Sequence, residues 1–429
     1  MRLGRLGPLA AALALLLPTP ALAGAAGHGG PIKAIAVAAD GKTALTGGFD
    51  YSVILWDLVE GAPLRRMIGH DAAVDAVAFL SGGRAVSASD DASLIVWDLA
   101  QGKALARWRA HSAKIAALAV SPDGSTVASG GWDRKLVLWN VADGRPRVLE
   151  GHEANINAVA FSPDGTRLAS GDYDGKIMLW RMPEGAPIET LSGNGFPVNA
   201  LAFAPDGRLL AALGDDTVRV LDPTAKRELL RFAAHAEPVV SLALSADGRI
   251  AASGSSGGTV EVWRSGNGER LRKLYAARGP VWALAFLAGG ERLLAGGADG
   301  TLREWALPSG IELLGNRPSG RAAPEPAERG AMLFRKCQAC HDFDPSDRSK
   351  AGPTFWHLIG RRAGTVAGYP YSEALRLSKL VWDEATIGRL FAEGPEVVAP
   401  GSKMPLQKMP SASDREELIE YLKRHADGG

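Results

Sequence analysis

The stretch GHEANINAVAFSPDGTRLASGDYDGKIMLW, residues 151–180, decides the fold of most of this 429-residue chain, because its pattern returns six more times. Apolar and polar residues alternate in short runs, turns such as Ser162-Pro163-Asp164-Gly165 separate the runs, and the last run ends at Trp180. Alternation with a period of two, bounded by turns rich in Gly and Asp, is typical of short β-strands. The segment therefore predicts three strands joined by tight turns.

The repeat continues on both sides of this segment with a constant period. Its last strand ends at a marker residue, spaced by 41 or 42 positions from copy to copy; the markers are Trp56, Trp97, Trp139, Trp180, Leu221, Trp263 and Trp305. A more polar run, such as residues 103–108, follows the marker and predicts a fourth strand. Seven units of four short strands predict an all-β fold, a seven-bladed β-propeller over residues 24–315.

Closure of the ring follows from the two ends of this region. Residues 24–31 are too rich in Gly to supply a strand to the last blade. Residues 311–314 are apolar enough to serve as the outer strand of the seventh blade itself. We therefore expect the ring to close by packing of the first blade on the seventh, without a shared strand.

The repeat resembles the WD40 family, whose blades commonly carry a buried hydrogen-bond chain from Trp to Ser or Thr, to His, to Asp. The matching sets in the first four blades are His28, Thr46, Asp50 and Trp56; His70, Ser87, Asp91 and Trp97; His111, Ser129, Asp133 and Trp139; and His152, Ser170, Asp174 and Trp180. The later sets are incomplete: Asn194, Ala211, Asp215 and Leu221; His235, Ser253 and Trp263 with Gly257 in place of Asp; and Asp299 and Trp305 without His. Two alternative explanations of this loss stay open: neutral drift in a closed ring, or a surface altered for a partner.

A second domain begins after the propeller. Residues 316–327 are rich in Pro, Gly and Ala and form neither strand nor helix comfortably, which predicts a linker. Beyond it the apolar spacing becomes helical, as at Leu418, Ile419 and Leu422. Residues 328–429 are therefore expected to form a small all-α domain.

Both cysteines of the chain lie in this domain, in the motif Cys337-Gln338-Ala339-Cys340-His341. Two thiols three positions apart can each attach to one vinyl group of a haem, and the adjacent imidazole then reaches the iron. A zinc site needs four ligands, usually with a second pair of cysteines, and a thioredoxin-like pair needs a βαβ setting. The motif predicts one covalently bound haem c, held by Cys337 and Cys340, with His341 as an iron ligand.

The helical domain resembles a class I cytochrome c of the mitochondrial and α-proteobacterial type. The resemblance rests on the haem motif and on Gly330, Phe334, Gly352-Pro353, Gly360-Arg361, residues 368–372, Trp382, residues 400–404 and Tyr421-Leu422. It implies that Met404 is the second axial ligand, with Met409 as the competing sulfur. Leu390 departs from the pattern, since relatives often have Tyr there.

The same resemblance implies the remaining haem contacts. The carbonyl of Pro353 would accept a hydrogen bond from the ring of His341 and fix its orientation. Arg361, Tyr371 and Trp382 would contact a buried haem propionate, where hydrogen-bond donors offset a negative charge at low dielectric. The plainer alternative is that the two aromatic residues belong to the core and that Arg361 lies on the surface.

Charge and the N-terminus bear on location and partners. Lys and Arg number 48 against 47 Asp and Glu, so the chain lacks the positive excess of a nucleic-acid binder. The first 23 residues combine Arg2 and Arg5 with an apolar run and a small-residue end at Ala23, which is the layout of a secretory signal. Prolines interrupt this run, so we expect cleavage near Ala23, a periplasmic protein and no stable membrane span.

These features together predict an exported electron-transfer protein, not an enzyme. The propeller would act as a docking scaffold for a periplasmic redox protein, a dehydrogenase or an oxidase. The lysines at 336, 350, 403 and 408 could steer an acidic partner to the haem. Two alternatives remain open: a subunit of a periplasmic oxidoreductase, and a haem-based redox sensor.

Overall fold

A computed structural model of the chain describes most of its residues between 27 and 426. The described residues are 27–192, 195–276, 279–287, 289–307, 309–314, 330, 333–334, 337, 341–345, 352–369, 371–402, 404, 409 and 411–426. The expected signal segment 1–23 and linker 316–327 lie outside them, as do Asn194, Cys340 and the lysines at 336, 350, 403 and 408.

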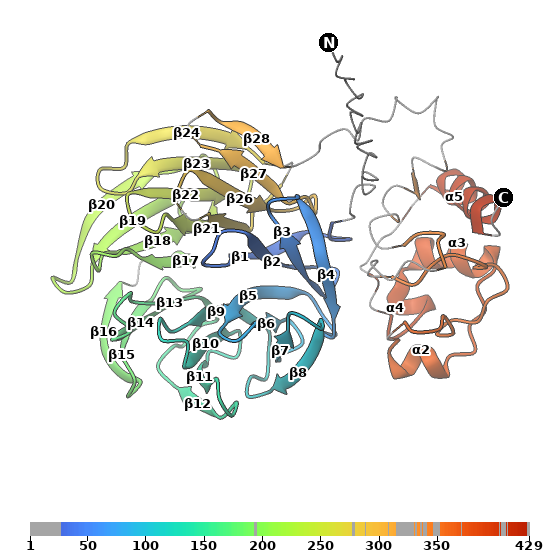
Figure 1. Cartoon of the computed structure of the whole chain (residues 1–429), viewed down its shortest axis with the longest axis horizontal. Helices are drawn as coiled ribbons and strands as arrows, with labels where there is room; N and C mark the ends of the chain where they lie inside the picture. The colour runs from blue at the N-terminus through green and yellow to red at the C-terminus, as the bar shows by residue number, and fades with distance from the viewer. Residues whose placement is uncertain are drawn as a thin grey trace, which may run out of the picture.

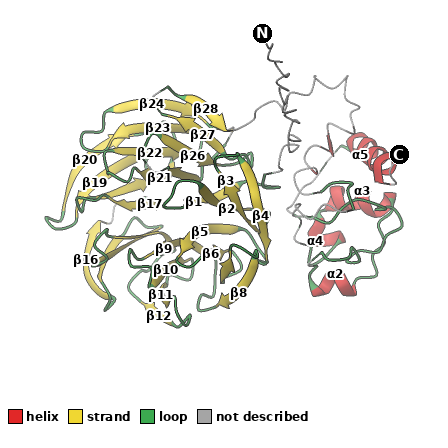
Figure 2. Cartoon of the chain, viewed as in Figure 1, coloured by secondary structure: helices red, strands yellow, loops and turns green. Residues whose placement is uncertain are grey.

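The N-terminal part is a ring of seven four-stranded antiparallel sheets (Figures 1 and 2). The strands are β1 (Ile32–Val37), β2 (Thr43–Gly48), β3 (Ser52–Asp57), β4 (Ala62–Ile68), β5 (Val74–Leu80), β6 (Arg84–Ser89), β7 (Leu94–Asp98), β8 (Lys103–Trp108), β9 (Ile115–Val120), β10 (Thr126–Gly131), β11 (Leu136–Asn140), β12 (Pro146–Leu149), β13 (Ile156–Phe161), β14 (Arg167–Asp172), β15 (Ile177–Arg181), β16 (Ala186–Ser192), β17 (Val198–Phe203), β18 (Leu209–Leu213), β19 (Thr217–Asp222), β20 (Arg227–Ala233), β21 (Val239–Leu244), β22 (Ile250–Ser255), β23 (Thr259–Arg264), β24 (Arg270–Tyr275), β25 (Ala283–Phe286), β26 (Arg292–Gly296), β27 (Arg303–Ala306) and β28 (Ile311–Leu314). Each sheet follows chain order, so the predicted propeller is confirmed.

The core of the ring lies between neighbouring blades. Leu138 of the third blade packs in one cluster with Trp180 of the fourth, and both side chains are buried. The second and third strands of a blade are covered on both faces, whereas an outer strand such as β8 is mostly exposed. This difference explains why only the fourth run of the repeat is polar in sequence.

The ring closes by packing, as expected. Residues 311–314 form β28, the outer strand of the seventh blade. The backbone N–H of Ile32 in β1 donates to the carbonyl of Gly297, at 3.0 Å. The side chain of Ile32 is fully buried in a cluster with Leu287 and Leu294 of the seventh blade. The first and last blades therefore share a hydrophobic interface, which stabilises the ring in proportion to the apolar area removed from water.

The buried hydrogen-bond chain is present in the first three blades with the residues expected. In the second blade the indole of Trp97 donates to Ser87 Oγ at 2.8 Å, and that hydroxyl lies 2.7 Å from His70 Nε2. Nδ1 of His70 lies 2.8 Å from the carboxylate of Asp91. Each of these four side chains in the second blade thus has a hydrogen-bond partner, as buried polar groups require. These bonds link the second and third strands of the blade, β6 and β7, to the turn that carries Asp91 and to the loop before β5 that carries His70.

The fourth blade corrects the sequence-based assignment. Nδ1 of His152 is 2.6 Å from the carboxylate of Asp172, and Asp174, which was expected in this place, is exposed. Asp172 pairs with the first residue of the first strand of its blade. In the first and third blades the residue in this position is a glycine, Gly48 and Gly131. A Cβ at Gly48 would lie 2.5 Å from His28 Nδ1. A carboxylate at this position therefore faces the imidazole directly and takes the bond.

In the sixth blade the buried hydrogen-bond chain is present without a carboxylate. Sequence comparison left its fourth member missing because Gly257 stands where Asp is expected, and the structure supplies a replacement. Nδ1 of His235 lies 2.8 Å from Thr259 Oγ1, and its Nε2 lies 2.9 Å from Ser253 Oγ. Burial is the largest influence on His235 and lowers its pKa from 6.5 to about 4. The imidazole is therefore neutral in the folded protein at neutral pH.

This shift predicts a pH dependence of stability. The unfolded chain binds a proton at His235 near pH 6.5, whereas the folded chain does so only near pH 4, so the free energy of unfolding falls as pH drops between these values. After allowance for partial exposure, the loss is roughly 2 kcal/mol. The free energy of unfolding, measured by denaturant titration, should differ less between pH 7 and pH 4.5 for His235→Gln than for the wild type. Equal differences in the two proteins would contradict the assignment.

The C-terminal domain is helical, as predicted. The helices with described bounds are α2 (Glu373–Leu377), α3 (Glu384–Glu393), α4 (Pro395–Val398) and α5 (Ala412–Ala426). A capping box between Asp383 and Thr386 starts α3. Buried Ile387 of α3 packs with Leu418 and Leu422 of α5. No helix within the described part of the chain is long and apolar enough to cross a membrane.

Candidate functional site

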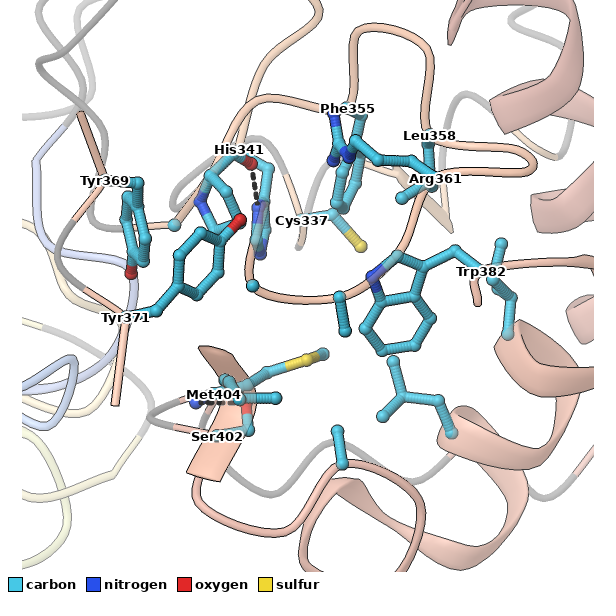
Figure 3. A pocket seen from close by; sticks show the side chains of 18 of the residues that line it. Cys337, His341, Phe355, Leu358, Arg361, Tyr369, Tyr371, Trp382, Ser402 and Met404 are labelled. Carbon is cyan, nitrogen blue, oxygen red and sulfur yellow. Dashed lines mark hydrogen bonds between the residues drawn. The ribbon is translucent and has the colours of Figure 1, made fainter. Parts of the chain in front are cut away.

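The helical domain contains a cavity that is partly open to solvent, with about 1280 Å³ of empty space when the open part is included. Seven of the eight predicted site residues line it: Cys337, His341, Pro353, Arg361, Tyr371, Trp382 and Met404. The eighth, Cys340, lies outside the described residues. Figure 3 shows His341 and Met404 on facing walls, with Trp382 to one side. Residues spread over nearly 70 positions of sequence are thus brought to one space.

His341 is held in one orientation by its surroundings. Its Nδ1 lies 2.7 Å from the carbonyl of Pro353, so this nitrogen carries the proton and donates it. Its ring stacks on Phe355, with centroids 4.3 Å apart and planes 14° from parallel. Gly352 permits this position, because a Cβ there would lie 2.2 Å from the imidazole. The lone pair is then on Nε2, and this tautomer of the imidazole binds a metal through Nε2.

The structure separates the two methionines that competed in sequence. Met404 lines the cavity, and its backbone N–H donates to Ser402 Oγ at 3.1 Å. Met409 is not among the residues that line this cavity, and its backbone N–H donates to the carbonyl of Phe391 at 2.7 Å. Its half-buried side chain packs on the hydrophobic core of the domain. Among these two sulfurs, the thioether of Met404 is the one presented to the cavity.

Arg361 is a wall residue with a partly buried guanidinium. Its Nη2 donates to the carbonyl of Thr354 at 2.7 Å, and its Nη1 donates to the carbonyl of Trp356. Burial lowers the pKa of Arg361, and burial also raises the pKa of Tyr371, with Arg361 opposing that rise. A guanidinium has five N–H donors, so two backbone bonds fix its position and leave capacity for a carboxylate.

Most of the other residues of the wall are apolar, and they were not singled out from sequence as part of a site. They include Leu358, Leu375, Ile387, Phe391, Ala399 and Leu422, together with Leu390. The helical spacing of Ile387, Leu390 and Phe391 in α3 was the available signal, and it indicates a buried face without showing what the face covers. Three propeller residues, Asp50, Tyr51 and Ile68, also line the cavity, and no sequence pattern pointed to them.

The two remaining histidines of the domain do not line the cavity. His357 is exposed, and Nδ1 of His425 lies 2.8 Å from the carbonyl of Tyr421 on the surface of α5. Among the described residues, the nitrogen and sulfur donors that line the cavity are therefore a thiol, an oriented imidazole and a thioether, and the wall around them is mostly apolar, with one guanidinium. This set fits a haem attached through sulfur and bound through nitrogen and sulfur.

Comparison with known proteins agrees with the division of the chain. The family model described as WD domain, G-beta repeat, matches seven segments that together cover more than half of the chain. They are residues 22–57, 61–98, 102–140, 145–181, 185–222, 226–264 and 268–306. Each matched segment ends within one residue of a marker position of the repeat.

The C-terminal domain is similar to cytochromes. Cytochrome c2 of Rhodomicrobium vannielii is 36% identical over 104 residues, which are 24% of this chain and 82% of that protein. Cytochrome c2 of Rhodoblastus acidophilus is 36% identical over 102 residues, 24% of this chain and 94% of the relative. Cytochrome c of Gibberella zeae is 36% identical over 97 residues, 22% of this chain and 91% of the relative. Each relative is matched over most of its length by the C-terminal domain.

Proposed function

The chain belongs to the WD40 repeat family and, over its C-terminal domain, to the cytochrome c family, and from this premise we propose that it is an exported one-electron carrier. One observation supports the proposal most strongly: Cys337, His341 and Met404 line a single apolar cavity, with the imidazole and the thioether on facing walls. A bound haem c supplies one-electron chemistry at its iron.

The residues of the chain have separate roles in this proposal. Cys337 and Cys340 would hold the haem covalently, and Nε2 of His341 and the sulfur of Met404 would bind its iron. The carbonyl of Pro353 keeps the imidazole in its binding orientation. Arg361, Tyr371 and Trp382 would contact a haem propionate. With two side chains bound to the iron, no coordination site would remain for a substrate, which favours electron transfer over catalysis.

The propeller is proposed as the scaffold that brings the haem to a protein partner. WD40 rings commonly serve as binding surfaces, an analogy at the level of the fold. We propose a periplasmic location after cleavage near Ala23, and a periplasmic redox protein, dehydrogenase or oxidase as partner. The haem c maturation step agrees with export, because cysteines of this motif are loaded on the exported side of the membrane.

Covalent attachment is tested by producing the full chain in a bacterium with haem c maturation machinery. The periplasmic fraction should contain one band that keeps its haem stain on a denaturing gel. The stain should be lost in the double variant Cys337→Ser/Cys340→Ser and in a chain lacking residues 1–23, but kept in Met404→Ala. Haem that is released by denaturation, or that is retained by the double variant, would refute the proposal.

A further inference from the structure

The cavity of the helical domain has a wall that comes from the propeller. Asp50, Tyr51 and Ile68 line it together with Tyr369 and Tyr371. The first two follow β2 at the turn into β3, and Ile68 ends β4. Figure 1 shows the helical domain on the side of the ring where β4 lies, and Figure 3 shows the faint blue ribbon of the first blade beside Tyr369 and Tyr371.

Tyr51 occupies a backbone conformation that disfavours its own side chain. The residue at this turn has a positive φ in all seven blades: Tyr51 64°, Ala92 60°, Arg134 67°, Gly175 87°, Asp216 65°, Gly258 95° and Gly300 71°. Glycine adopts this region freely, whereas a bulky side chain there is strained. Tyr51 is the one aromatic residue among the seven. A strained residue persists where other contacts offset the strain, so its side chain is expected to have a role.

The turn that carries Tyr51 is held firmly. The carboxylate of Asp50 accepts hydrogen bonds from His28, Arg66 and the hydroxyl of Ser52, each at 2.8 Å. Burial alone would raise the pKa of Asp50, but His28 and Arg66 outweigh it and hold that pKa well below its usual range. Ser52 pairs with Ile68 across β3 and β4. The turn and the strand end therefore present Tyr51 and Ile68 as one fixed surface.

The second blade shows that this scaffold does not by itself require a tyrosine. Arg107 contacts Asp91 and Ser93 there as Arg66 contacts Asp50 and Ser52. The residue at the strained position is Ala92, and no residue of this turn lines the cavity. Among the seven equivalent described turns, the aromatic side chain thus occurs at the turn that lines the cavity.

We infer that the first blade is the docking surface for the chain's own helical domain, with Tyr51 and Ile68 closing the cavity beside Tyr369 and Tyr371. The inference rests on the proposed function only in that the cavity is taken to hold the haem. The aromatic ring and the branched aliphatic chain match the apolar wall that they complete, and they keep water from that side of the cavity. An external redox protein reaches this side only when the two domains separate.

The variant Tyr51→Gly tests the docking in the haem-loaded full chain. Glycine relieves the strain at φ 64°, so the blade is expected to fold at least as well as in the wild type. Hydrogen exchange of the backbone amides of residues 366–369, 371 and 372 is expected to become about tenfold faster, because a weaker contact opens more often. Arg134→Gly, at the equivalent turn of the third blade, is the matched control and should leave this exchange unchanged.

A second variant, Ile68→Asp, places a charge in the apolar wall and should also accelerate the exchange. If both first-blade variants exchange as slowly as the wild type, or if Arg134→Gly has the same effect as Tyr51→Gly, the docking inference is refuted. The exchange is measured on amides of the chain, so its result stands whatever the haem stain shows. Absence of the haem stain from the wild-type chain refutes the proposed function, whereas unchanged exchange refutes only the docking.

Discussion

Met404→Ala is expected to keep its covalent haem and to lose the weak sulfur-to-iron charge-transfer band of the oxidised protein. The reduced variant should bind carbon monoxide, and its reduction potential should fall by roughly 0.2 V, since axial ligands set haem potentials over a range of about 0.8 V. Thioether sulfur favours ferrous iron, which is why its loss lowers the potential. Optical spectra and a potentiometric titration measure all three changes.

Met409→Ala is the matched control for this experiment. Met409 packs on the domain core and is not among the residues that line the cavity, so its removal should leave the band and the potential unchanged. Loss of the band in Met409→Ala with its retention in Met404→Ala would reverse the ligand assignment. Loss in neither variant would show that no methionine of this pair binds the iron.

Asp172→Ala is expected to lower the free energy of unfolding by about 3 kcal/mol, because removing one partner leaves the other buried without its hydrogen bond. His152 and Asp172 are 2.6 Å apart, and their side chains are almost fully buried. The carboxylate of Asp172 also accepts from the backbone N–H of Lys176, at 2.9 Å. Denaturant titration of the full chain at neutral pH measures the loss.

Asp174→Ala supplies the comparison, because Asp174 is exposed and should change stability by no more than about 0.5 kcal/mol. Asp172→Asn should retain part of the stability, since its amide oxygen can still accept from the imidazole. The opposite order, with Asp174→Ala the more damaging, would restore the assignment made from spacing alone.

The propeller could be predicted because its pattern of strands and turns repeats along the sequence. One period of 41 or 42 residues fixed the number of blades, the four strands of each and the outer strand at residues 311–314. The hydrogen-bond partners were less predictable, because positions 172 and 174 both carry Asp and differ only in how the turn directs them. The replacement of a carboxylate by Thr259 depends likewise on geometry that spacing does not encode.

The candidate site divides in the same way. The close spacing of Cys337, Cys340 and His341 was enough to predict a haem site. The resemblance to a family added Met404, Pro353, Arg361, Tyr371 and Trp382. The structure adds the orientation of His341, which depends on the absent side chain of Gly352. The contribution of Tyr51 could not be read from sequence, because no local pattern records which blade a second domain meets.

The optical spectrum of the reduced, haem-loaded full chain, taken before and after addition of carbon monoxide, tests the central claim most directly. If His341 and Met404 are the two iron ligands of an electron carrier, as proposed, the haem is low-spin and carbon monoxide does not change its spectrum. A high-spin haem, or one that binds carbon monoxide in the wild-type protein, would contradict this claim and would indicate an open site for a substrate or a gas.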